Sequence, residues 1–102
     1  MGWILIIVIF TKIAIAAFAG EGDVVGFARS ISDGVSNGYI SLVSVREDFR
    51  RQGVATAMIN RLMGDDPRLT WVLRASPESR EFWGTLGFVP STWAMERLRQ
   101  AR

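Results

Sequence analysis

The 102-residue sequence contains no cysteine and no histidine. A disulfide framework, a Cys or His nucleophile, a His general base and the usual zinc sites are therefore excluded. The net charge is also small: it is formally +2, and the pI of about 9.9 reflects arginines without histidine. So small a surplus does not imply bulk nucleic-acid binding. No nucleic-acid partner and no metal site are expected.

Internal repeats and low-complexity linkers are also absent. Hydrophobic residues make up 49% of the chain, which is enough for a core and argues against disorder. A chain of this length is expected to form one domain. We therefore interpret residues 1–102 as a single domain.

Residues 1–19 are an apolar segment, and a membrane anchor must be weighed there. The length is close to that of a bilayer span, but Lys12 would lie at mid-depth, at a cost of roughly 2.5 kcal/mol or more. Met1–Trp3 lacks the basic start of a signal peptide. Isoleucine and valine favour strands. We predict strands at Ile4–Phe10 and Lys12–Ala19, or one long bent strand. Insertion of this segment into a membrane is the minority alternative. We expect a cytoplasmic location.

Two turns rich in Gly, Asn and Asp divide the next part of the chain. They occupy residues 20–23 and 32–38, and a β-branched strand pattern follows each of them. These patterns predict strands at Val24–Ile31 and Tyr39–Arg46. The first half of the chain is therefore expected to be an antiparallel meander.

The last of these strands leads into a basic turn and an amphipathic helix. From Val54 onward the apolar residues have helical spacing, with Met58 and Leu62 on the same face. Gly64 is expected to end this helix, and Pro67 prevents its continuation. The order is strand, glycine-containing turn, helix.

This turn has the features of an anion site. The first N–H groups of a helix have no partner within it and carry its partial positive charge. Gly53 allows a ligand to approach the backbone, and Arg50 and Arg51 add full positive charge. The turn predicts a phosphate or pyrophosphate site. The alternative is an ordinary β-turn-α unit with a solvated basic turn.

The second half predicts one more helix between two strands. Leu69–Ala75 reads as a strand, which would complete a β-α-β crossover. Ser76 is expected to cap a helix over Pro77–Leu86 that Gly87 ends. Thr92–Arg99 is expected to form a last strand.

Two segments carry a resemblance to a known family. Arg50-Arg51-Gln52-Gly53-Val54-Ala55 resembles the acyl-CoA-binding motif Arg/Gln-x-x-Gly-x-Gly/Ala of the GCN5-related N-acetyltransferases (GNATs). Phe82-Trp83-Gly84-Thr85-Leu86-Gly87-Phe88 resembles the Phe-Tyr-x-x-x-Gly-Phe segment of that family. The resemblance covers roughly residues 23–98. It implies an α+β, GNAT-type acyl-CoA N-acyltransferase fold, with a mixed, mostly antiparallel sheet and two main helices.

The resemblance also implies a donor site for acetyl-CoA as cosubstrate. The backbone of Gln52–Thr56 would hold the pyrophosphate, the backbone of Val43–Val45 would pair with the pantetheine arm, and the N–H of Val45 would polarise the carbonyl. Since the chain has no cysteine, acyl transfer would be direct. The expected donor-site residues are Val43, Ser44, Val45, Arg50, Arg51, Gln52, Gly53, Val54, Ala55, Thr56, Ser79 and Trp83.

The catalytic side chains depart from the family pattern. Trp83 stands where the family often has a Tyr proton donor, and Leu42 where it often has an acid. Tyr39, the only tyrosine, is the candidate proton donor, although it is equally a normal strand aromatic. Glu47 and Asp48 are further candidates for accepting a proton through water, or are simply solvated turn acids.

The helices that family members usually carry between the first two strands have no room in this chain. Their absence would leave apolar sheet surface uncovered, so we expect a homodimer in which residues 1–19 pack against a second copy. Two functions stay open. One is an N-acetyltransferase that transfers the acetyl group of acetyl-CoA directly to a primary amine of a small acceptor. The other is a catalytically degenerate, dimeric acyl-CoA-binding module without turnover.

Overall fold

The structure is a computed structural model, and it describes residues 4–9, 12–20 and 22–100. Two short 3-10 helices precede the two α-helices. The predicted pair of N-terminal strands is present, although Phe10 lies outside the described residues. The elements in chain order are β1 (Ile4–Ile9), β2 (Lys12–Ala19), β3 (Asp23–Ser32), β4 (Asn37–Val45), η1 (Glu47–Phe49), α1 (Val54–Met63), β5 (Thr70–Leu73), η2 (Pro77–Ser79) and α2 (Arg80–Thr85).

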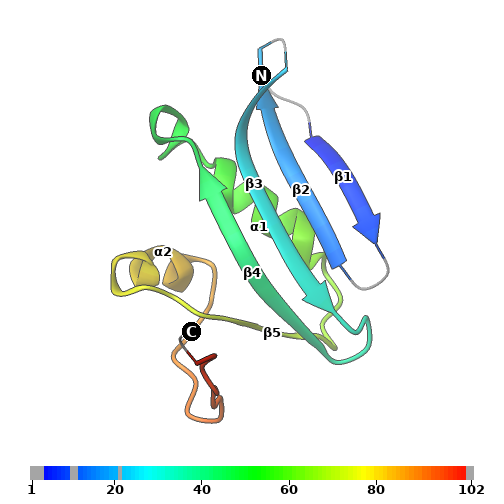
Figure 1. The fold of residues 1–102 in the computed structure, drawn as a ribbon, viewed down its shortest axis with the longest axis vertical. Helices are drawn as coiled ribbons and strands as arrows, with labels where there is room; N and C mark the ends of the chain where they lie inside the picture. The colour runs from blue at the N-terminus through cyan, green and yellow to red at the C-terminus, as the bar shows by residue number, and fades with distance from the viewer. Residues whose placement is uncertain (1–3, 10–11, 21, 101–102) are drawn as a thin grey trace.

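The strands form one five-stranded sheet in the order β1-β2-β3-β4-β5 (Figure 1). The first four strands are antiparallel neighbours, and β5 pairs parallel to β4. A parallel pair needs a crossover connection, and α1 provides it. The predicted α+β fold with a mixed, mostly antiparallel sheet and two helices is confirmed.

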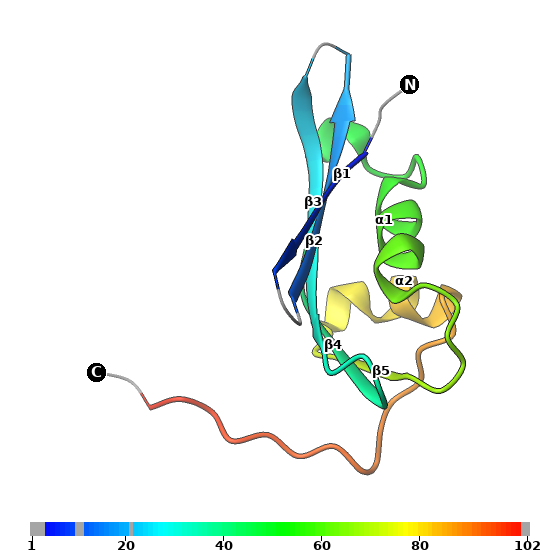
Figure 2. The ribbon, with the colours of Figure 1, turned by 90° about the vertical axis from the view of Figure 1, so that its right-hand side faces the viewer.

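Helix α1 covers one face of the sheet (Figure 2). Its apolar stripe packs against β2, β3 and β4. Gly26 on β3 makes this approach possible, because a Cβ there would come within 2.9 Å of Cε of Met58. The most deeply buried members of this core, at most 4% exposed, are Ile15, Val25, Ala28, Ile40, Met58, Ile59 and Leu62.

No helix of the described residues covers the opposite face of the sheet (Figure 2). Side chains of β3, β4 and β5 remain open to water there, with Ile31 at 42%, Leu42 at 40% and Val72 at 39% exposure. The expected uncovered apolar surface is therefore present. What covers it in solution stays a prediction.

The prediction of a strand at Thr92–Arg99 is wrong. The segment is extended, but within the described residues it pairs with no strand. Figure 2 shows it leaving the body of the molecule toward the side opposite α1. Its large side chains are in water, with Trp93 92% and Met95 97% exposed. A strand pattern is not sufficient, because a strand also needs a neighbouring edge to complete its hydrogen bonds.

The second helical region is shorter than predicted, and Ser76 does not cap it. The hydroxyl of Ser76 donates to Oγ of Ser79 at 3.1 Å, and a 3-10 turn precedes α2. The predicted end at Gly87 is confirmed by its φ of 92°. The N–H of Phe88 donates to the carbonyl of Trp83 at 3.1 Å, which closes the helix in a glycine-dependent cap.

A search of the described residues for a helix that is long and apolar enough to cross a membrane found none.

Gly38 allows a close contact between β4 and β5. A Cβ at this position would lie 2.4 to 2.7 Å from ring carbons of Trp71, its partner residue on β5. We expect Gly38→Ala to lower the free energy of unfolding by about 1–3 kcal/mol, because the indole ring must move. Urea unfolding followed by tryptophan fluorescence measures this.

Gly84→Ala is the matched control for Gly38→Ala. A Cβ at Gly84 meets no atom within 4 Å, and the residue lies in α2 with an ordinary backbone conformation. Alanine there should raise the free energy of unfolding by up to about 1 kcal/mol. Equal effects of the two substitutions would contradict the proposed role of the Trp71 contact.

Ser30 is a polar exception in the core. It is 1% exposed, and its hydroxyl has no hydrogen-bond partner among the described residues. Since an unsatisfied buried hydroxyl costs about 1–3 kcal/mol, we expect Ser30→Ala to leave the stability unchanged or raise it by about 1 kcal/mol. Denaturant unfolding checks the sign; a loss above 1 kcal/mol would show that the hydroxyl is satisfied.

Candidate functional site

The site begins where β4 and β5 separate. Their parallel pairing ends at Ile40 and Leu73, so the rest of β4 has no strand beside it on this edge within the described residues. The N–H of Arg46 donates to the carbonyl of Val25 on β3 at 2.7 Å. Because the backbone groups of successive strand residues point to alternate edges, the N–H and C=O of Val45 point the other way, into the gap.

A cleft of about 870 Å³ occupies this gap. It lies within the volume range of small-molecule sites. Its walls are the second half of β4, the turn into α1, the end of β5 and the start of the second helical region. The lining residues are Ile40, Ser41, Leu42, Val43, Ser44, Val45, Phe49, Arg50, Arg51, Gly53, Val54, Ala55, Thr56, Leu73, Arg74, Ser76, Ser79, Phe82 and Trp83.

The turn into α1, residues 50–56, forms a backbone cradle at one end of the cleft. Gly53 has a φ of 79°, and Arg51, at 65°, is the only non-glycine residue of the described ranges with a positive φ. The first bond of the helix runs from the N–H of Ala57 to the carbonyl of Gly53, and no side chain caps the helix. The N–H groups of Val54–Thr56 are therefore available to an anion.

The arginines of the turn differ in what they contact. Nε of Arg50 donates to the carbonyl of Val45 at 3.0 Å, which ties the turn to β4. Arg46 makes two contacts to Asp48, at 2.7 and 3.1 Å, and their hydrogen bond holds the pKa of Asp48 below its ordinary value. Arg51 has no ion pair within the described part of the chain. Arg50 has no ion pair there either, so no carboxylate of the described residues neutralises the two guanidinium groups of the cradle.

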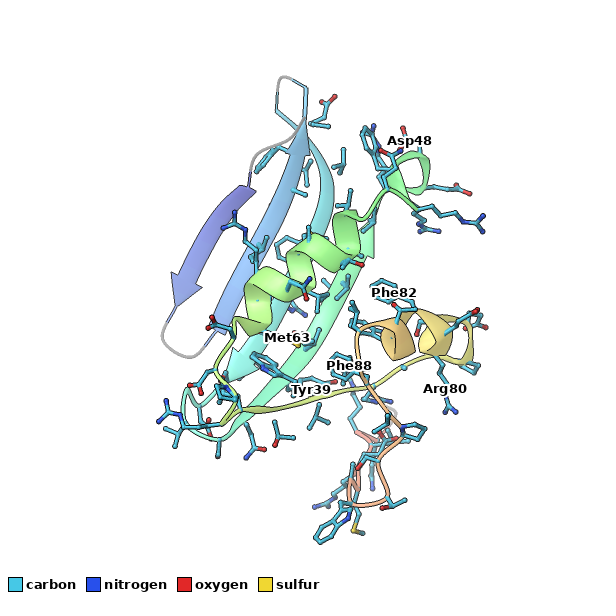
Figure 3. The ribbon with its side chains drawn as sticks, turned by 180° about the vertical axis from the view of Figure 1, so that it is seen from behind. Tyr39, Asp48, Met63, Arg80, Phe82 and Phe88 are labelled. Carbon is cyan, nitrogen blue, oxygen red and sulfur yellow. The ribbon has the colours of Figure 1, made fainter. Side chains whose placement is uncertain are left out.

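Aromatic side chains form the opposite wall of the cleft. Trp83 is 8% exposed and packs edge-on against Phe82 and Phe88, with ring centroids 5.0 and 5.4 Å apart. Its indole has only an N–H donor and cannot release a proton near neutral pH. Beside it, the hydroxyl of Ser79 donates to the carbonyl of Ser76 at 3.0 Å. Figure 3 shows Phe82 and Phe88 on either side of this second helical region.

Most of the residues predicted for the donor site line this one cleft; Gln52 does not. The side chain of Gln52 is exposed and donates to the backbone carbonyl of Asp48 at 3.3 Å. Eight further residues line the cleft that were not predicted for the donor site: Ile40, Ser41, Leu42, Phe49, Leu73, Arg74, Ser76 and Phe82. Arg74 lies within the predicted strand Leu69–Ala75 and directly after β5, which ends at Leu73. Its charge near the end of a predicted strand was the available signal.

The structure does not bring the candidate proton-transfer residues to the cleft. Tyr39 lies at the start of β4 and lines a separate cavity of about 460 Å³ with Ile31 and Val72. Asp48 lies beyond the other end of β4, as Figure 3 shows, and is paired with Arg46. Neither Glu47 nor Asp48 lines the cleft. A proton-transfer role for these residues has no support from the cleft geometry.

Comparison with known proteins assigns the fold and the family. The family model described as an acetyltransferase (GNAT) domain matches residues 11–98. Among curated protein sequences no match is found. The chain belongs to the GNAT acetyltransferase family, and the predicted family is confirmed.

Solved structures agree with this assignment. A GNAT-family protein from Xanthomonas campestris pv. campestris, assigned as an acetyltransferase, has 26% identity and a TM-score of 0.75, over 87% of this chain and 66% of its own. A protein from Deinococcus radiodurans R1 that is assigned as an acetyltransferase has 24% identity and a TM-score of 0.71, over 83% of this chain and 60% of its own. A third structure, AAC(6')-Iy bound to a CoA-containing bisubstrate analogue, has 21% identity and a TM-score of 0.68, over 89% and 71%. The chain therefore spans less than two thirds of the first two structures.

Gly53→Glu tests the cradle. The substitution places bulk and negative charge where the anion would approach, so we expect acetyl-CoA affinity to fall at least roughly 100-fold, or about 2.7 kcal/mol. Isothermal titration calorimetry measures it.

Gly34→Glu controls for the backbone strain of the Gly53 variant. Gly34 also has a left-handed φ, of 71°, and open space around its Cα, but it lies in the loop before β4, away from the cleft. Its variant should bind acetyl-CoA normally. Unchanged affinity in Gly53→Glu would contradict the cradle.

Proposed function

We propose that the chain is an N-acetyltransferase that transfers the acetyl group of acetyl-CoA directly to a primary amine of a small acceptor. The observation that carries this proposal is the backbone cradle at residues 50–56, which opens into the gap between β4 and β5. Family membership supports it, as does the structural neighbour that holds a CoA-containing analogue.

The residues present fit an acyl-CoA. The free N–H groups at the start of α1 and the guanidinium of Arg51 suit its phosphates. The unpaired edge of β4 offers backbone groups to the amides of the pantetheine arm, much as an added strand would. Because backbone groups supply most of these contacts, the fit depends on conformation more than on side-chain identity.

The chemistry that the chain itself would supply is orientation and polarisation. The N–H of Val45 points into the gap and would donate to a thioester carbonyl oxygen, which stabilises the charge that develops there. Holding the two reactants together also removes much of the entropic barrier. A thiol leaving group with a pKa near 8.5 does not strictly need an enzyme acid. Transfer without a dedicated proton donor is therefore chemically feasible.

The second candidate is an acyl-CoA-binding module without turnover. One observation favours it: Trp83 and Leu42, both in the cleft wall, stand where a proton donor and an acid are expected by resemblance. A homodimer formed through residues 1–19 and the uncovered sheet face is proposed for either function. A cytoplasmic location stays a prediction.

Two measurements distinguish the candidates. Calorimetric titration with acetyl-CoA, with CoA alongside, tests the donor site; we expect micromolar affinity and about one site per chain. Release of free CoA thiol in the presence of an amine panel tests turnover. Binding with thiol release above the rate of the Gly53→Glu variant supports the transferase. Binding with no amine-dependent release supports the module.

Tyr39→Phe tests the only tyrosine. Since Tyr39 lines the separate cavity and not the cleft, we expect the variant to retain turnover within about twofold at neutral pH. Rates of CoA release across pH 6–9 measure this. A loss of tenfold or more, with acetyl-CoA affinity unchanged, would return the proton-donor role to Tyr39.

A further inference from the structure

Arg74 is the one ionisable residue of the cleft wall that lies outside the cradle. It directly follows Leu73, whose side chain packs with Ile40 toward α1, so strand alternation directs Arg74 to the opposite face. Nε of Arg74 is 3.1 Å from a carboxylate oxygen of Glu96. Glu96 belongs to the segment that passes on the side of the sheet away from α1 (Figure 2). The cleft is therefore lined by the two arginines of the cradle and by Arg74, which lies on the side of the sheet away from α1.

The partner of Arg74 is replaceable. The two side chains are 64% and 56% exposed, and exposed ion pairs contribute little. The segment around Glu96 is not packed against the body, as the exposure of Trp93 and Met95 shows. A carboxylate on a bound molecule can displace that of Glu96 from the guanidinium and form an ion pair of the same kind.

No residue lining the cleft can accept a proton from the amine. Its only ionisable side chains are Arg50, Arg51 and Arg74, and guanidinium groups stay charged. The amine must therefore arrive neutral. At pH 7 about one in ten peptide α-amines, with a pKa near 7.9, is neutral, against about one in 2,500 lysine side chains, with a pKa near 10.4. This difference, together with repulsion of a cation by three arginines, selects against strongly basic amines.

We propose that the acceptor is the α-amino group of a peptide that carries a carboxylate close behind it, with Arg74 binding that carboxylate. The inference rests on the proposed acetyl transfer and names its substrate class. The neutral amine nitrogen attacks the thioester carbon, the C–N bond forms as the C–S bond breaks, and the amine proton passes to the departing thiolate, directly or through water. The products are an N-acetyl peptide and CoA.

The experiment uses three short peptides that differ in one feature each. The first has a free N-terminus with Glu as its second residue and an amidated C-terminus. The second replaces that Glu by Gln. The third keeps the Glu but has a blocked N-terminus and one lysine. Initial rates of CoA release at pH 7, with mass spectrometry of the products, are compared for the full chain, for Arg74→Gln and for Arg97→Gln. Arg97 is a matched arginine of the exposed segment outside the cleft.

The full chain should acetylate the Glu peptide at least 10-fold faster than the Gln peptide, and at least 10-fold faster than the lysine peptide. Arg74→Gln should abolish the preference for the Glu peptide, so that this variant acetylates the Glu and Gln peptides at equal rates. Arg97→Gln should behave as the unsubstituted chain. The rate should rise with pH until about 8, as the peptide amine loses its proton.

Several results would overturn the inference. They are equal rates for the Glu and Gln peptides, a preference that survives in Arg74→Gln, an equal rate with the lysine peptide, or no acetylation of any peptide. Calorimetry with acetyl-CoA separates the causes. If the chain binds acetyl-CoA but modifies no peptide, the acceptor class is wrong, whereas no binding overturns the proposed function itself. If Arg74→Gln also loses acetyl-CoA binding, Arg74 belongs to the donor site.

Discussion

The divergence of β4 from β5 is the constraint on which the site depends. The two strands pair over four residues at one end, with the ring of Trp71 lying against Gly38, and then separate. Because the pairing stops, the last residues of β4 keep their β3 neighbour but have no strand partner on the other edge among the described residues, where the carbonyl of Val45 accepts from Arg50. Because α1 crosses between the same two strands, its uncapped start lies at the mouth of that gap. One interruption of a sheet thus creates both the cleft and its polar lining.

The two ends of the cleft follow different physical rules. At the cradle, backbone N–H groups and a left-handed turn would make most of the contacts to a bound anion, and the side chains need only leave space for it. At the Arg74 end, the proposed recognition would depend on side-chain charge, since the backbone there is already past the end of β5. The proposed donor site therefore corresponds to a short sequence motif, whereas the proposed acceptor end depends on one charged side chain.

The local structure of the cradle is predictable from the sequence because its requirements are local. A glycine at the turn, an amphipathic helix after it and a strand before it are visible in consecutive residues, and the structure brings all but Gln52 of the predicted donor residues to one cleft. The prediction of a strand at Thr92–Arg99 is wrong for the opposite reason. Its strand pattern is local, but a strand also needs hydrogen bonds to the edge of a sheet formed by distant residues. Among the described residues this segment pairs with no strand. Tyr39 was attractive as the only tyrosine, and only the structure shows that it lines another cavity.

Ser76 is a second position at which the local sequence pattern and the structure differ. A serine followed by proline and glutamate is a strong helix-start pattern, yet its hydroxyl contacts Ser79 while a 3-10 turn begins the element. The residue types predict where the helical region starts, but they do not predict which hydrogen bonds form in its first turn. Such details depend on how the segment packs against Trp83 and its aromatic neighbours, which no local pattern encodes.

The left-handed backbone of Arg51 has a consequence for how the protein balances stability against use. A non-glycine residue in that conformation carries a strain of order 1–2 kcal/mol, and Gly or Asn would adopt it more easily. The chain instead has a long cationic side chain there, which is exposed and has no ion pair among the described residues. Replacing Arg51 by glycine would therefore relieve backbone strain and, in the same step, remove a positive charge from the turn. Stability and charge at this turn are in that sense opposed in one residue.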